Sequence, residues 1–166
     1  MKRLLLLVVL VMAVAMQVSL LPAMRPFGVV PNLLLGLVLL LGLRSTVSWA
    51  LILAVAGGVV MDLSSGADFG LHTGILVLAA LITGLVRRSG LTLVGPLILI
   101  GLVTMMTVLS GAINLTAVLG SLTPGAIGPV IGILTGELVL NLILTLGARP
   151  IINWLVADES ALPAIG

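Results

Sequence analysis

Residues 57–74 read GGVVMDLSSGADFGLHTG. This segment holds two acidic residues, Asp62 and Asp68, together with His72, the only histidine of the chain. Long apolar runs flank it on both sides. Its backbone and carboxylates need water or protein partners, which the hydrocarbon core of a membrane does not supply. We therefore predict that the segment is the tip of a hairpin between two membrane-spanning helices.

The composition is typical of an integral membrane protein. Of 166 residues, 61% are hydrophobic and 7% are charged, whereas soluble domains carry about 25% charged residues. The mean hydropathy is +1.45. A net charge of +2 forms no basic patch, so we expect no nucleic-acid partner. The lack of cysteine and the single histidine exclude thiolate and multi-histidine metal centres, and we expect no metal and no cofactor.

The apolar runs predict an all-α membrane protein with one integral domain, residues 1–156, built as a bundle of six transmembrane helices in the lipid bilayer. Each crossing needs roughly 20 apolar residues, and fewer where the bilayer is thin. The predicted helices cover about residues 4–21, 29–43, 46–61, 71–86, 91–109 and 130–148. A short interfacial segment, 151–156, and a C-terminal tail, 157–166, follow.

Two alternatives concern the first half of the chain. Residues 13–15 read AVA and resemble a signal-peptide cleavage site after Ala15, although the hydrophobic run continues well past them. A single helix over residues 29–61 would avoid two short crossings, but it would place Arg44 near the centre of the bilayer at a cost of about 3 kcal/mol. We therefore predict two tilted crossings in this region.

The basic residues predict the topology. If six helices cross the membrane and both termini are cytoplasmic, the outer side receives only Arg25. The cytoplasmic side then receives Lys2, Arg3, Arg44, Arg87, Arg88 and Arg149. Cytoplasmic loops of membrane proteins carry such an excess of Lys and Arg. We therefore predict a multi-pass protein of the cytoplasmic membrane, with the turn after Asp62 on the outer face.

The turn supplies the residues that we single out for partner binding or for a structural role. They are Asp62, Ser64, Ser65, Gly66, Asp68, Gly70 and His72. A cation site is one alternative, but two carboxylates are few for calcium and their spacing is not that of an EF-hand. We favour a structural role in which Asp62 ends one helix and Asp68 caps the next, because an acid stabilises the N-terminus of a helix.

Nothing in the sequence indicates an enzyme. The motifs Ser-x-x-Lys, His-Glu-x-x-His and Gly-x-x-x-x-Gly-Lys are absent. A serine hydrolase would use Ser64 or Ser65 with His72, but all three lie in one short turn and no other segment supplies an oxyanion hole. We therefore predict no catalytic residue.

Glu137, Asn141 and Thr145 recur every four residues and share one face of the last predicted helix. Glu137 falls near the middle of the bilayer, where an ionisable side chain indicates a function or a hydrogen bond between helices. We expect a protonated Glu137 that donates a hydrogen bond to Thr104 or Thr107 of the fifth crossing. Binding of a ligand or transfer of a proton is the alternative.

Two rows of small residues also recur every four positions. One row is Gly128, Gly132 and Gly136, and the other is Ala50, Ala54 and Gly58. Small residues let membrane helices approach one another closely. The sequence leaves open whether each row packs within the chain or against the single span of a partner.

Several motifs occur together along most of the chain. They are a short basic N-terminus, Pro31-Asn32-Leu33, Asp62-Leu63-Ser64-Ser65-Gly66, Gly70-Leu71-His72 and Arg87-Arg88. In this combination the chain resembles the rod shape-determining protein MreD family of bacteria. Where this chain has Pro31-Asn32-Leu33, the family commonly has Pro-Asp-Leu. The family also commonly has a proline before a Leu-Gly-Leu-His segment. This chain has Asn32 and Asp68-Phe69 there instead, so the resemblance implies no role for an acid at position 32.

The resemblance implies a non-enzymatic component of the cell elongation machinery, which directs lateral peptidoglycan synthesis. The implied partners are MreC in direct contact, and MreB, RodA and its transpeptidase partner within the same machinery. The family is similar in fold to the substrate-binding component of energy-coupling factor transporters. The alternative function is therefore that of a substrate-binding subunit in a small-molecule transporter.

Overall fold

The computed structural model describes residues 2–24, 28–65, 69–90, 95–118 and 127–156. Within these ranges all regular structure is helical, which confirms the predicted all-α class. The elements are α1 (Lys2–Ala15), the π-helical turn η1 (Met16–Leu20), α2 (Leu21–Met24), α3 (Leu33–Arg44), α4 (Val47–Ser65), α5 (Leu71–Arg88), α6 (Gly95–Val118) and α7 (Ile127–Val156). Because α1, η1 and α2 follow one another without a break, we call them together the first helix.

Five helices are long and apolar enough to cross a membrane, judged by length and composition. They cover Leu4–Met24, Val47–Ser64, Leu71–Arg88, Gly95–Ile113 and Gly128–Val156. The remaining helix, α3, has 12 residues. At about 1.5 Å per residue it is roughly 18 Å long, whereas the hydrocarbon core of a bilayer is about 30 Å thick.

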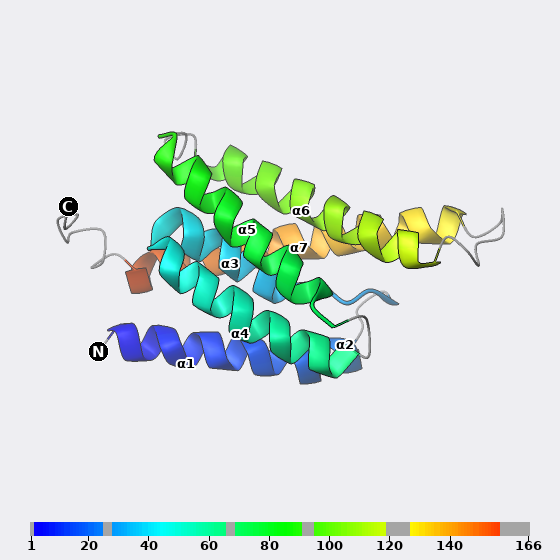
Figure 1. Ribbon diagram of the computed structural model, residues 1–166, viewed down its shortest axis with the longest axis horizontal. Helices are drawn as coiled ribbons and strands as arrows, with labels where there is room; N and C mark the ends of the chain where they lie inside the picture. The colour runs from blue at the N-terminus through cyan, green and yellow to red at the C-terminus, as the bar shows by residue number, and fades with distance from the viewer. Residues whose placement is uncertain (1, 25–27, 66–68, 91–94, 119–126, 157–166) are drawn as a thin grey trace.

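The short helix α3 lies at the centre of the bundle. Its residues 34–42 are all buried, and it packs against α4, α5, α6 and α7. The outer helices instead expose large apolar side chains such as Leu4 and Leu85, as expected where lipid replaces water. Figure 1 shows that the start of α1 and the end of α7 lie at the same end of the bundle.

The two rows of small residues have different surroundings. On α4, Ala50 and Ala54 are fully buried, and a Cβ on Gly58 would lie 2.5 Å from the Cα of Thr73 on α5. This row therefore packs within the chain and brings the backbones of α4 and α5 together. On α7, a Cβ on Gly128 or Gly132 would meet no described atom within 4 Å. A Cβ on Gly136, the third member of that row, would lie 3.1 Å from a methyl group of Val29.

Several helix boundaries differ from the predicted ones, and α6, for example, runs to Val118 instead of residue 109. The helix α4 continues to Ser65, so Asp62 lies within a helix and not in the turn. The helix α3 begins at Leu33, because Asn32 accepts a hydrogen bond from the backbone N–H of Leu35 and caps it. Finally, α7 continues through Pro150 to Val156, so residues 151–156 belong to the same helix and not to a separate segment.

Burial explains why α7 does not end at its proline. Pro150 removes one backbone donor from the helix, which is a cost that neighbouring helices can offset in membrane proteins. Beyond it, Ile152, Leu155 and Val156 are almost completely buried in the core of the bundle. The last turns of α7 are therefore held by packing against other helices.

Candidate functional site

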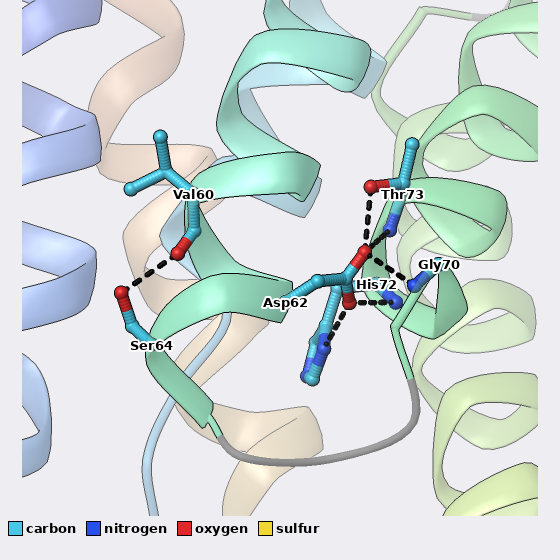
Figure 2. A network of polar contacts seen from close by, with 6 residues as sticks. All are labelled: Val60, Asp62, Ser64, Gly70, His72 and Thr73. Carbon is cyan, nitrogen blue, oxygen red and sulfur yellow. Dashed lines mark hydrogen bonds and ion pairs between the residues drawn. The ribbon is translucent and has the colours of Figure 1, made fainter.

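The carboxylate of Asp62 joins the end of α4 to the start of α5. Its Oδ1 accepts a hydrogen bond from the backbone N–H of His72 at 2.8 Å and lies 2.9 Å from Nδ1 of the same residue. Its Oδ2 accepts hydrogen bonds from the backbone N–H groups of Gly70 and Thr73, at 3.0 and 3.2 Å, and from the hydroxyl of Thr73 at 2.6 Å. Figure 2 shows these contacts around one side chain. We call Asp62, Gly70, His72 and Thr73 the Asp62 clamp.

The clamp pairs two kinds of group that are costly to leave without partners, which are the N–H groups at the start of a helix and a buried carboxylate. The first N–H groups of a helix have no partner within the helix, and they form its positive end. Asp62 is 3% exposed, and a buried carboxylate is costly unless it is well hydrogen-bonded. Because the N–H groups at the start of α5 donate hydrogen bonds to the carboxylate, both the helix end and the buried charge have hydrogen-bond partners.

Capping of α5 therefore comes from an unexpected residue. The N-cap position is Gly70, with φ of 99° in the left-handed region, and it makes no side-chain capping bond. We predicted that Asp62 would end one helix and that Asp68 would cap the next. The structure assigns the capping of α5 to Asp62, which reaches across from α4. Asp68 lies outside the described residues, as does Gly66.

Ser64 does not form a catalytic pair with His72 in the described part of the chain. The hydroxyl of Ser64 donates a hydrogen bond to the carbonyl of Val60 at 2.7 Å, and Nδ1 of His72 faces Asp62. Ser65 is the last residue of α4. The described residues also contain no group of three or more His, Asp or Glu side chains that could hold a metal ion.

A recess of about 320 Å³ lies beside the Asp62 clamp. Its walls come from the first helix, the segment before α3, the end of α4 and the start of α5. The lining residues are Gln17, Val18, Pro22, Val30, Met61, Ser64 and His72. This volume is within the range of small-molecule sites, about 300 to 1,000 Å³. The recess combines apolar walls with three polar side chains, so it can hold a molecule that has both kinds of surface.

Gln17 holds the irregular backbone that precedes α3. Its side-chain N–H donates to the carbonyl of Pro31 at 3.0 Å, and its Oε1 accepts from the backbone N–H of Leu33 at 2.7 Å. Non-helical backbone inside a membrane bundle needs such partners, because lipid offers none. Gln17 belongs to the π-helical turn η1, a type of irregularity that is frequent at functional sites.

Asn141 holds the same segment from the opposite side. Its Oδ1 accepts a hydrogen bond from the backbone N–H of Asn32 at 2.6 Å, and its Nδ2 donates to the hydroxyl of Thr107 at 3.0 Å. Both Asn141 and Thr107 are buried. Asn141 thus connects α7 with α6 and with the start of α3.

The polar face predicted on the last helix is present and faces the bundle. Asn141 and Thr145 are almost completely buried, and Thr145 packs against Gly36 of α3. The side chain of Glu137 is partly buried and is hydrogen-bonded to Asn141. We predicted a bond from Glu137 to Thr104 or Thr107, but the hydrogen bond to Thr107 comes from Asn141.

Sequence reasoning missed several residues of these two networks. Thr73 follows His72 directly, and its hydroxyl makes the shortest bond of the clamp. Gln17 is a lone amide within an apolar run, which could have indicated a buried hydrogen bond. Thr107 was considered only as a partner for Glu137. Asn32 was noted as a departure from the family motif, and not as a helix cap.

No protein family, curated protein or solved structure matches the chain. The described residues form an all-helical bundle with several helices that are long and apolar enough to cross a membrane. Within it lie a clamped hairpin, a buried polar network around the start of α3, and a recess between them.

Proposed function

We propose that this protein is a non-enzymatic membrane scaffold of the bacterial cell elongation machinery, which binds MreC and influences the peptidoglycan synthase. MreB, RodA and its transpeptidase partner are the other members of that machinery. The proposal rests on the sequence motifs that resemble the MreD family. The structural observation that supports it best is the Asp62 clamp, because the clamp includes the most specific of those motifs.

The clamp makes the tip of the α4–α5 hairpin suitable for binding another protein. Leu63 and Phe69 are 71% and 70% exposed at this tip. Phe69 lies between the candidate crossings Val47–Ser64 and Leu71–Arg88, so its exposed ring is at the membrane surface, where an external part of a partner can reach it. Exposed apolar side chains next to polar ones are typical of sites of protein interaction. A fixed hairpin presents them with little loss of conformational freedom on binding.

A second surface for a partner is the small-residue face of α7. Gly128 and Gly132 are exposed and have open space around them. The row on α4 is already used for packing within the chain, so the face on α7 is the one that remains for the single span of MreC.

In this proposal α3 counts as a sixth crossing, and both termini are cytoplasmic. The start of α1 and the end of α7 lie at the same end of the bundle, which agrees with an even number of crossings. The hairpin tip with Phe69 then lies on the outer face, where an external domain of MreC can reach it.

The test is co-purification of MreC with variants of the hairpin tip. The double variant Leu63→Ser and Phe69→Ser should reduce the recovered MreC about fivefold or more, since buried apolar anchors dominate such interfaces. Leu85→Ser is the matched control, because Leu85 is 65% exposed at the opposite end of α5. In cells, loss of the protein should convert rods into round cells. If MreC recovery is unchanged and cell shape is normal, the proposal fails.

A second candidate function is that of a substrate-binding subunit of an energy-coupling factor type transporter. The recess beside the Asp62 clamp favours it, because a small solute would fit a volume of about 320 Å³. Recovery of a soluble vitamin bound to the purified protein would support this function over the scaffold.

A further inference from the structure

We propose that the seam between the first helix and α4 is a binding site for one polar lipid. In this site an apolar groove holds an acyl chain, and the recess beside the Asp62 clamp holds a headgroup that donates hydrogen bonds. The inference concerns a ligand and does not depend on the identity of any protein partner.

The apolar part of the site is a groove of about 440 Å³. Its walls come only from α1 and α4, and they consist of Leu7, Leu10, Val11, Val14, Ala15, Trp49, Ile52, Leu53, Ala56 and Val60. In Figure 1 the end of α4 lies beside the end of the first helix, and the two helices diverge toward the start of α1. Small side chains at Ala15 and Ala56 leave the space open.

The groove and the recess follow one another along the same two helices. On the first helix the groove ends at Ala15 and the recess begins at Gln17. On α4 the groove ends at Val60 and the recess begins at Met61. The recess also lies where the candidate crossing ends, at Ser64. An apolar groove beside a polar recess at the end of a crossing matches the arrangement of apolar and polar surface in a lipid.

The polar atoms of the recess determine which headgroup fits. Asp62 only accepts hydrogen bonds when it is ionised, so Nδ1 of His72 carries the hydrogen between them. In the neutral ring Nε2 is then an acceptor. The hydroxyl of Ser64 uses its hydrogen in the bond to Val60, so in the recess it can act only as an acceptor. No lysine or arginine of the described chain lines the recess. A headgroup with ammonium or hydroxyl donors fits these acceptors. Gln17 also lines the recess, and the N–H of its amide that is not bonded to Pro31 can donate to the phosphate of the lipid.

Size argues against a helix as the occupant of the groove. The groove follows α4 from Trp49 to Val60. An α-helix is about 10 Å across with its side chains, so a whole helix is too wide to enter the groove and could place only side chains in it. A soluble solute would fill the recess alone and would leave the groove to bulk lipid. A single acyl chain attached to a polar headgroup uses both parts.

The experiment compares two lipids that differ in hydrogen-bond donors. Dioleoyl phosphatidylethanolamine has N–H donors, and dioleoyl phosphatidylcholine has the same chains without them. Titrated into the purified full-length protein and followed by native mass spectrometry, the first should bind about tenfold more tightly. Dioleoyl phosphatidylglycerol has hydroxyl donors but no ammonium group, and it should also bind more tightly than phosphatidylcholine. That result would show that the site recognises hydrogen-bond donors and not the ammonium group itself.

The contribution of the groove is tested by Ala56→Phe, which fills it. Val55→Phe is the matched control, because Val55 is exposed on the same helix and does not line the groove. Ala56→Phe should abolish the preference for phosphatidylethanolamine, and Val55→Phe should preserve it. Because His72 is the only histidine, ¹⁵N-histidine labelling gives one pair of ring signals, and phosphatidylethanolamine should shift the Nε2 signal.

Three results would overturn the inference. Equal affinity for phosphatidylethanolamine and phosphatidylcholine would remove the headgroup site. Unchanged lipid binding in Ala56→Phe would remove the acyl-chain groove. A Nε2 signal that responds to a soluble solute, and not to either lipid, would assign the recess to that solute instead.

Discussion

At the scale of single residues, one carboxylate connects the two helices of the α4–α5 hairpin. Asp62 accepts hydrogen bonds from two residues that belong to another helix, and also from Gly70, which precedes that helix. A charged acceptor with several donors contributes more than a neutral one. The same residue therefore caps α5, fixes its distance from α4 and orients the ring of His72.

Replacement of Asp62 by asparagine should destabilise the protein by about 2 to 3 kcal/mol, because an amide has one acceptor oxygen and adds unwanted donors. The control Thr73→Val removes only the hydroxyl bond to Asp62 and should cost about 1 kcal/mol. The free energy of unfolding, measured by titration with SDS in mixed micelles, checks both values. Equal and small effects would show that the clamp contributes little.

Gln17 provides a second test at this scale. Gln17→Leu keeps the apolar character of the first helix but leaves the carbonyl of Pro31 and the N–H of Leu33 without their partner. The expected loss is about 2 kcal/mol or more, because unpaired buried polar groups are costly. Ser19→Ala, an exposed change in the same π-helical turn, is the control and should have no effect on the unfolding midpoint.

At the scale of elements, the spacing between helices depends on where a Cβ would collide. Gly58→Ala would place a methyl group against the backbone of Thr73, so α4 and α5 would have to separate. We expect a loss of stability of about 2 kcal/mol or more, typical of overpacking. Gly132→Ala adds the same methyl group where no described atom lies within 4 Å, and its unfolding should match the wild type. Similar losses in both variants would show that the effect comes from helix propensity or the unfolded state.

The same scale shows what the sequence could predict and what it could not. The existence of the long helices follows from hydropathy alone, and the small-residue rows were found from their spacing. The origin of the cap on α5 was not predictable, because Asp62 acts from a neighbouring helix and sequence rules describe caps within one helix. The central position of α3 was also missed, since a helix that is apolar all round is equally compatible with lipid and with a core.

At the scale of the whole molecule, the predicted topology places the Asp62 clamp and the turn after α5 on opposite sides of the membrane. The chain has no cysteine, so single cysteines report location without interference. Ser64→Cys should react with a membrane-impermeant maleimide in intact cells. Ser89→Cys, exposed at the other end of α5, should react only after permeabilisation. The reverse pattern of labelling would invert the proposed orientation.

The enclosed start of α3 also bears on how the chain is made. Its cap region is completed by Asn141, which follows Asn32 by 109 positions. During synthesis the ribosome releases the N-terminal helices long before α7 exists, so the interior of the growing protein stays unfinished until the last helix enters the membrane. In a nascent chain that stops before α7, the backbone N–H of Asn32 therefore lacks the side chain that accepts its hydrogen bond in the folded protein.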